Sequence, residues 1–373
     1  MRILYYYPEV DSSMFQWQRI GFMDELSRHN VEFDIFNPLL FDNLEAANDE
    51  LVKRAKAQKY DLFFTNLCNE KHLLPEALKE IKRIGLPTVT FRSDNLIIPF
   101  NDKSLARYFD VVWLTSKETS RLYKKWGATT FFAPYAANPY QYKYIPQDLV
   151  RRICFVGSLY GSRPLMVNNL SRGGYPVDVY CKKNVHSSSI VNTSVSTKYV
   201  LPKLTTSEIL KGRLTFSEGH RLILGSVVSK IKKNTILDEN DNVSVLPSVP
   251  FNEMIQKYSS YSLSIAYTSS ETTDVLKHPL KIIDLRNFEI PMCGGVEFCR
   301  HNEELASYFK DGEEIIFYNS DEELLDKANF IINNAKDEDI IRIKRAARKK
   351  AENEHSWWNR FSLLFREMGL SVK

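Results

Sequence analysis

The sequence has 373 residues, of which 14 are glycine, 43% are hydrophobic and 26% are charged, and its formal net charge is +4. This length exceeds the range in which one hydrophobic core keeps growing, so two domains are expected. The composition is globular and excludes a disordered chain, a collagen and a small disulfide scaffold. A glycine-rich phosphate loop is also excluded, because neither G-x-G-x-x-G nor G-x-x-x-x-G-K-[ST] occurs.

The cysteines and the N-terminus bear on the cellular compartment. Five cysteines, an odd number without C-x-x-C spacing, predict reduced thiols of a cytosolic protein. The N-terminus runs directly into a strand-like segment and lacks the pattern of a signal peptide. No apolar run reaches the roughly 18 residues of a transmembrane helix. We therefore expect a cytoplasmic protein, with peripheral contact at the inner face of the membrane as a further option.

Charge is distributed unevenly along the chain. Residues 151–235 carry 14 basic and 3 acidic side chains, whereas residues 236–373 carry 17 basic and 24 acidic ones. A basic block can face a polyanion or an anionic membrane, or it can simply be a solvated face. The block lacks the interleaved aromatic residues of a single-strand nucleic-acid groove and does not read as an amphipathic basic helix. No nucleic-acid partner is therefore expected.

The first third of the chain alternates short apolar strands with helices. Strands are predicted at Arg2–Tyr7, Val31–Phe36, Asp61–Thr65, Pro87–Phe91, Val111–Leu114 and Phe131–Pro134. Helical spacing occupies Phe15–Arg28, Leu51–Gln58, Leu74–Ile84 and Ser116–Trp126. This alternation predicts βαβ units around a parallel sheet, and hence a Rossmann-like domain over residues 1–140.

A polar segment with two prolines, residues 138–148, is predicted to link this domain to a second one at residues 150–354. Strands are predicted there at Arg152–Gly157, Val177–Tyr180, Val243–Leu246, Leu263–Tyr267 and Ile315–Phe317. Helices are predicted at His220–Ile231, Lys281–Phe288, Asp321–Phe330 and Asp339–Glu354. The C-terminal segment His355–Met368 is amphipathic. Its adjacent Trp357 and Trp358 fit either a domain junction or ordinary core packing.

The segment Lys281–Leu305 is the most informative about function. Its apolar residues anchor one face and leave Lys281, Arg286 and Glu289 able to face a cleft. A carboxylate accepts hydrogen bonds from both hydroxyls of a ribose, while lysine and arginine neutralise a diphosphate. The pair Gly294-Gly295 allows a close backbone approach. Spacing alone also allows a surface helix in which Arg286 pairs with Glu289.

No motif in the sequence predicts a metal site. The seven histidines show no ligand spacing, and there is no HExxH. The one D-x-D, Asp337–Asp339, lies between two predicted helices, where acidic residues favour a helix start. No metal or other cofactor is therefore expected.

Several segments match a known family. The string Arg286–Gly295 (RNFEIPMCGG) resembles the R-x-F-E-x-x-x-C-G-G stretch of CgeB-type, spore-maturation-like glycosyltransferases, which are similar to retaining family 4 glycosyltransferases. Phe155–Tyr160, followed by Arg163, resembles the F-V-G-S-x-Y…R opening of the C-terminal domain of that family. Pro134–Pro139 and Pro250–Met254 resemble two further segments. The likeness covers about residues 130–365.

The resemblance implies the GT-B architecture, in which two Rossmann-like α/β domains face a cleft and a C-terminal helix, about residues 355–373, crosses back to the first domain. It implies that the C-terminal domain holds a nucleotide-sugar donor. Glu289 would then bind the ribose, and Arg163, Lys281 and Arg286 the diphosphate. The remaining donor-site candidates are Gly157 and Ser158 near the phosphates, Val249 near the base, and the turn Gly294-Gly295.

One departure from family 4 concerns its paired glutamates. Glu289 and Glu297 have the E-x7-E spacing, but the following Cys293-Gly294 aligns Glu289 with the second glutamate. Lys281 then occupies the position of the first, which leaves the stereochemical outcome open. Glu297 is interpreted as structural.

The resulting hypothesis is a metal-independent glycosyltransferase. It would move a sugar from a nucleoside-diphosphate sugar to a glycan, lipid-linked or other acceptor in bacterial surface polysaccharide or glycoconjugate synthesis. The acceptor would lie on the first domain, where Glu9, Asp11 or Asp94 would be the base of an inverting enzyme, and a retaining enzyme would need none. Two alternatives are a nucleotide-sugar epimerase and a non-catalytic sugar-nucleotide-binding protein.

Overall fold

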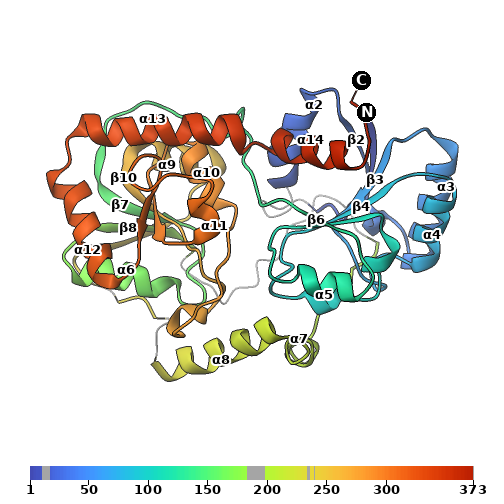
Figure 1. Ribbon diagram of the computed structural model, residues 1–373, viewed down its shortest axis with the longest axis horizontal. Helices are drawn as coiled ribbons and strands as arrows, with labels where there is room; N and C mark the ends of the chain where they lie inside the picture. The colour runs from blue at the N-terminus through green and yellow to red at the C-terminus, as the bar shows by residue number, and fades with distance from the viewer. Residues whose placement is uncertain (11–16, 183–197, 233–235, 239, 373) are drawn as a thin grey trace. The chain divides into compact units, whose positions relative to one another are not determined.

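The computed structural model describes residues 1–10, 17–182, 198–232, 236–238 and 240–372, which form two compact units. Unit 1 comprises Met1–Pro134, Ser189–Gly219 and Trp357–Lys373, and unit 2 comprises Tyr135–Ser188 and His220–Ser356. Each unit is an α/β fold built on its own parallel sheet (Figure 1). Neither unit is a continuous stretch of the chain.

Unit 1 has six parallel strands in the order β2-β1-β3-β4-β5-β6. The strands are β1 (Arg2–Tyr6), β2 (Glu32–Phe36), β3 (Leu62–Thr65), β4 (Thr88–Arg92), β5 (Val111–Leu114) and β6 (Thr130–Phe132). The helices are η1 (Arg19–Met23), α2 (Asp24–Ser27), η2 (Pro38–Leu40), α3 (Leu44–Ala57), α4 (Pro75–Arg83), η3 (Pro99–Asp102), η4 (Ala106–Tyr108), α5 (Ser120–Lys125), α7 (Thr206–Arg213) and α14 (Trp357–Glu367). Residues 15 and 16 of the first predicted helix lie outside the described residues.

The C-terminal helix α14 packs in unit 1, which confirms the predicted return to the first domain. The ring of Trp357 is buried, with its centroid 5.6 Å from that of Phe22 and 6.0 Å from that of Phe91. The Glu25 carboxylate accepts the backbone N–H groups of Trp357 and Trp358, each at 3.0 Å. A negative charge is favourable there because the first turn of a helix leaves its N–H groups unpaired.

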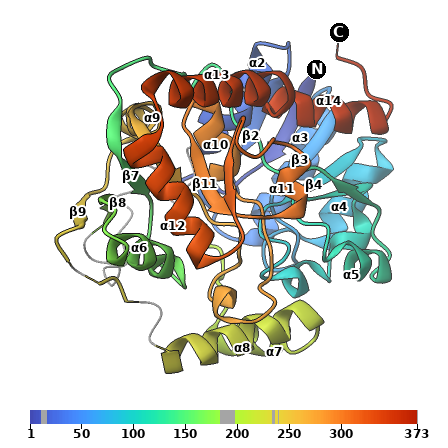
Figure 2. The same ribbon diagram turned by 60° about the vertical axis from the view of Figure 1, so that its left-hand side comes forward.

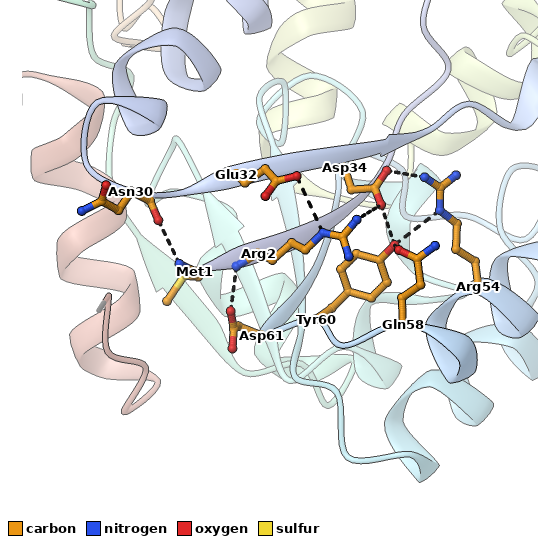
Figure 3. Close-up of polar contacts among 9 residues, drawn as sticks. All are labelled: Met1, Arg2, Asn30, Glu32, Asp34, Arg54, Gln58, Tyr60 and Asp61. Carbon is orange, nitrogen blue, oxygen red and sulfur yellow. Dashed lines mark hydrogen bonds and ion pairs between the residues drawn. The ribbon is translucent and has the colours of Figure 1, made fainter.

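The edge strand β2 is tied to its neighbours through Asp34 (Figure 3). Its carboxylate accepts from Arg2 at 3.0 Å, from the hydroxyl of Tyr60 at 2.6 Å, and from Arg54 of α3. These contacts fix β2 against β1 and α3. They satisfy a carboxylate that is largely buried, as a folded interior requires.

Unit 2 also has six parallel strands, in the order β12-β11-β10-β7-β8-β9. The strands are β7 (Val150–Val156), β8 (Val177–Cys181), β9 (Val243–Pro247), β10 (Tyr261–Ile265), β11 (Glu297–Arg300) and β12 (Ile316–Tyr318). The helices are α6 (Arg163–Arg172), α8 (Ser217–Lys232, whose first residues belong to unit 1), α9 (Phe251–Ser260), η5 (Thr273–Val275), α10 (Arg286–Met292), α11 (Glu303–Ala306), α12 (Asp321–Asn329), η6 (Phe330–Asn334) and α13 (Asp337–Glu354). Helix α13 lies alongside α10 in both views (Figures 1 and 2).

The strand order of unit 2 is that of a doubly wound dinucleotide-binding sheet. Strands β7, β8 and β9 run outward in one direction, and β10, β11 and β12 run outward in the other. The order therefore reverses between β7 and β10. In sheets of this kind ligands bind beyond the carboxyl ends of the strands at this reversal.

The predicted helix over Lys281–Phe288 is wrong in its position. Lys281 instead pairs with Ser269 as an isolated bridge, and α10 begins only at Arg286. Two side chains near the start of α10 bond to the backbone. Asp284 accepts the N–H of Arg286 at 2.9 Å, and Asn287 accepts the N–H of Asp284 at 2.7 Å. Such local bonds favour a helix start over a helix interior.

The predicted second domain at 150–354 also differs from the structure in one region. Residues 198–219 belong to unit 1, where the N–H of Lys198 donates to the Leu39 carbonyl at 2.9 Å. Lys71 forms an ion pair with Glu208 of α7 at 2.6 Å. These contacts join residues far apart in the sequence, so no local sequence pattern predicts them.

The segment predicted as a linker, residues 138–148, packs as part of unit 2. The guanidinium of Arg348 on α13 donates to the carbonyl of Pro139 at 2.9 Å, and also to the carbonyls of Tyr142 and Met292. One arginine thus joins this segment to the carboxyl end of α10.

Candidate functional site

The strand reversal in unit 2 gathers the principal candidate residues. The loop between β7 and α6 begins with Gly157 and Ser158 and ends at Arg163, the first residue of α6. Helix α10 contributes Arg286 and Glu289, four residues or fewer from its start. The structure therefore brings five of the predicted donor-site residues to the edge where doubly wound sheets bind ligands.

Arg286 lies directly against the end of β7. Its Nε donates to the Val156 carbonyl at 2.9 Å. A Cβ atom on Gly157 would lie 2.4 Å from Nη2 of Arg286, and the φ angle of Gly157 is +144°. Glycine is required here both by the backbone conformation and by the guanidinium that occupies the space of a side chain.

The environment of Arg286 keeps its positive charge. Burial alone would lower the pKa of this guanidinium, but the neighbouring Tyr258, Asp284 and Glu289 outweigh that effect and raise the pKa. A half-buried cation at the end of a parallel sheet is suited to bind an anionic ligand.

Arg163 forms the second cationic element of the site. Its guanidinium donates to the Ser158 carbonyl at 3.1 Å and to the Tyr160 hydroxyl at 3.0 Å, and its carbon lies 4.1 Å from the centroid of the Tyr160 ring. Asp284 lies 3.7 Å from this guanidinium and also accepts from the backbone of Arg286. Asp284 therefore links the two arginines.

Glu289 is held by a tyrosine from the segment before β7. The hydroxyl of Tyr142 donates to Oε1 of Glu289 at 2.6 Å. Burial raises the pKa of Glu289, and the positive charge of Arg286 and the Tyr142 hydrogen bond oppose that rise. The hydrogen bond from Tyr142 thus fixes the carboxylate in position through Oε1 and does not involve Oε2.

The turn Gly294-Gly295 ends α10. The N–H of Gly294 donates to the Pro291 carbonyl and that of Gly295 to the Ile290 carbonyl, each at 2.8 Å, and Gly294 has a φ of +66°. These bonds form a Schellman motif, which satisfies the last carbonyls of a helix. A Cβ on Gly294 would lie 2.5 Å from the ring of Tyr144, so its contact is with the 138–148 segment.

Two other donor-site candidates lie apart from this cluster. Val249 is half-buried in the loop between β9 and α9. The ammonium of Lys281 pairs with Glu303 at 3.3 Å, and no contact among the described residues joins it to Arg286.

The candidate bases are in unit 1. Glu9 follows β1, where the strand order of that sheet reverses, and Nη2 of Arg19 donates to its Oε2 at 2.8 Å. Asp94 is exposed in the turn after β4, and β3 lies between β1 and β4 in the sheet. Asp11 lies outside the described residues. Among those described, no group of three His, Cys, Asp or Glu side chains could hold a metal ion.

Sequence reasoning missed Tyr142 and Asp284 as parts of this site. Tyr142 lies in a segment that was interpreted as a linker, and its pairing with Glu289 spans 147 residues. Asp284 lies in a segment predicted as helix. Its spacing from Arg286, D-x-R, was the available signal for a helix start.

Comparisons with known proteins bear on this arrangement. Residues 208–366 match a family model described as "Glycosyl transferase-like". The chain also resembles solved structures over 99% of its length and 99% of theirs. They are an alpha-glucosyltransferase in complex with UDP-glucose and DNA (12% identity, TM-score 0.60), HepE of Anabaena in complex with UDP-glucose (10%, 0.57) and sucrose-phosphate synthase from Thermosynechococcus elongatus (10%, 0.55).

The chain has the GT-B fold. The two parallel six-stranded sheets and the full-length likeness confirm the fold class expected from the sequence. A comparison with curated protein sequences gives no match. Arg286 and Glu289 lie within the residues that the family model covers, whereas Gly157, Ser158 and Arg163 precede them in the sequence.

Proposed function

We propose that the protein is a glycosyltransferase that uses a nucleoside-diphosphate sugar. The observation that carries this proposal is the contact of Arg286 with Val156 and Gly157 at the strand reversal of unit 2, with Glu289 on the same helix. A diphosphate needs cations and free N–H groups, and a ribose needs a fixed carboxylate. The family-model match to residues 208–366 supports the same class of activity.

In this proposal Arg286 and Arg163 neutralise the diphosphate. The start of α6 and the backbone at Gly157 and Ser158 approach its oxygens, since a helix N-terminus favours anions. Glu289, held by Tyr142, accepts the hydroxyls of the ribose. The charge that develops on the departing diphosphate is stabilised by these groups without a metal ion.

The residues in less central positions complete the proposed donor site. Val249 lies towards the base, Lys281 contributes positive charge, and Gly294-Gly295 shapes the end of α10. Lys281 in place of a first glutamate leaves both stereochemical outcomes open. An inverting reaction would use Glu9 or Asp94 as base.

The finer identity is also part of the proposal. The motif RNFEIPMCGG supports a CgeB-type enzyme that is similar to family 4. The acceptor would be a glycan or a lipid-linked sugar of bacterial surface polysaccharide or glycoconjugate synthesis. The five cysteines, all free and buried, support a cytoplasmic location.

Donor binding is tested first with a thermal-shift screen of UDP-, GDP-, CMP- and dTDP-sugars. UDP-glucose leads the panel because two of the similar structures contain it. A ligand present at about 100 times its Kd stabilises the native state by about 2.7 kcal/mol, which is readily measured as a rise in Tm. We expect Glu289→Gln to reduce this rise, and Glu322→Gln, an exposed control on α12, to keep it.

A turnover assay of the nucleotide sugar that stabilises the protein, with and without acceptors, separates the competing functions. Binding with turnover only when an acceptor is present supports transfer. Turnover of the donor without acceptor would indicate an epimerase, and binding without any turnover would indicate a non-catalytic protein. No stabilisation by any nucleotide sugar would contradict the donor site itself.

Gly157→Ala is expected to weaken donor binding by about tenfold or more. The new methyl group would overlap Nη2 of Arg286 and displace the guanidinium from Val156. Gly174→Ala is the matched control, because Gly174 also has a positive φ, +89°, but no atom lies within 4 Å of its added Cβ. Both variants carry backbone strain of about 1–3 kcal/mol, because both positions have a positive φ angle. Equal affinities for UDP-glucose by calorimetry in the two variants would contradict the placement of Arg286.

A further inference from the structure

Helix α8 packs on unit 2 through a face of small residues. Gly225 and Ser229 are buried, and a Cβ on Gly225 would lie 3.1 Å from the Thr272 carbonyl. The hydroxyl of Ser226 lies 3.3 Å from that of Thr272, and Arg221 donates to the His278 carbonyl. Leu222 is the one large apolar residue on this inner face.

The opposite face of α8 presents large apolar side chains to solvent. The exposed fractions of Leu224, Val227 and Ile231 are 53%, 51% and 76%. Residues at i, i+3 and i+7 share one side of a helix because each residue advances it by about 100°. The usual pattern is reversed here, since soluble helices turn their small or polar face outward. Figure 2 shows α8 in yellow-green.

Basic side chains border this apolar face. At about 100° per residue, Lys230 falls on one side of the stripe and Lys232 on the other. Both are exposed, and neither pairs with an acid among the described residues. The helix belongs to the basic block at 151–235, which holds 14 basic and 3 acidic side chains. The outer face of α8 therefore combines three apolar side chains with two lysines of this block.

We propose that the outer face of α8, defined by Leu224, Val227, Ile231, Lys230 and Lys232, binds an anionic membrane surface. A helix with an apolar stripe between cations lies in the membrane interface, with the stripe among the acyl chains and the lysines at the headgroups. No helix among the described residues is long and apolar enough to cross a membrane, so this contact is peripheral. A nucleic acid would use the lysines but leave the apolar stripe in water.

The test is sedimentation of the full chain with vesicles, without donor or acceptor. Vesicles of phosphatidylcholine with about one-third phosphatidylglycerol should bind the protein, and pure phosphatidylcholine should not. The variant Leu224→Ser/Val227→Ser/Ile231→Ser should bind at least about tenfold more weakly. Lys230→Ala/Lys232→Ala should lose about fivefold per lysine.

Matched controls separate this face from general effects of charge and apolarity. Phe330→Ser removes a side chain that is 56% exposed elsewhere in unit 2. Lys310→Ala/Lys349→Ala removes the same charge from other surfaces of that unit. Both should bind vesicles like the wild type, and all variants should keep its melting temperature because the changed side chains face solvent.

Three results would overturn the proposal. The first is a wild type that does not bind anionic vesicles, or a triple serine variant that binds them unchanged. The second is tighter binding to duplex DNA that depends on the lysines and not on the apolar residues. The third is a dimer in sedimentation velocity that the triple variant dissociates, since a second copy would then cover the stripe. None of these readouts depends on glycosyl transfer, so the two proposals can fail separately.

Discussion

Arg286→Ala is expected to raise the Kd for a UDP-sugar by about 100-fold or more. Hydrogen bonds to charged groups contribute about 1.5–3 kcal/mol each, and a guanidinium can donate two of them to one diphosphate. The side chain is already held by its bond from Nε to the Val156 carbonyl, so little ordering is lost on binding. Calorimetry with UDP-glucose and with UDP alone measures the loss of affinity. An equal loss for both ligands shows that Arg286 contacts the nucleotide part and not the sugar.

Two further variants test whether this effect is specific. Arg286→Lys keeps a charge but loses the planar fork, so an intermediate Kd is expected. Arg300→Ala removes an arginine that is paired with Asp321 at 3.5 Å in the same unit, and it should leave the Kd unchanged. If Arg286→Ala binds like the wild type, or if both alanine variants weaken binding equally, Arg286 does not contact the donor.

Glu297→Gln is expected to flatten the pH dependence of stability. Glu297 is fully buried, and Asn287 donates to its Oε1 at 2.6 Å. Burial raises the pKa of Glu297 to about 8 in the folded chain, against about 4.3 when unfolded. Between these values the folded state binds a proton that the unfolded state has released. The contribution of Glu297 to the free energy of unfolding is therefore greatest at the acidic end of this range and falls as pH rises, by about 1.4 kcal/mol per pH unit.

The glutamine variant carries no titrating group at this position. Its free energy of unfolding should therefore exceed that of the wild type increasingly from about pH 5 to about pH 8, by several kcal/mol at the upper end. Urea denaturation at three pH values measures this difference. Glu303→Gln is the control, because Glu303 is 86% exposed. A difference between Glu297→Gln and wild type that stays constant with pH would show that Glu297 is charged in the fold.

Much of the secondary structure follows from local pattern. The unit 1 strands predicted from apolar runs lie within two residues of the observed ones, because buried parallel strands read as continuous apolar segments. Strand β11 was missed because its run EFCR begins and ends with charged residues. The first residue of this strand, Glu297, is buried, accepts a hydrogen bond from Asn287 and has a raised pKa. These properties depend on tertiary packing, so the local sequence does not show them.

The main residues of the candidate site could be predicted from the sequence, but the residues that hold them in position could not. Arg286, Glu289 and the start of α6 were singled out from motif and spacing, and the structure brings them to one edge of a sheet. Their donor role stays a prediction. The bond from Tyr142 and the link through Asp284 depend on how distant segments pack. A single sequence carries no signal for such pairings.

The position of α14 has a consequence for synthesis on the ribosome. Proteins made residue by residue usually complete their N-terminal domain first. Here the aromatic interior of unit 1 takes Trp357 and Phe361 from the end of the chain, and Glu25 stays without the N–H groups of α14 until then. Unit 1 is therefore begun first and finished last, after all of unit 2 has been translated. In a nascent chain that stalls before residue 357, the hydrophobic core of unit 1 lacks α14 and stays partly exposed to solvent.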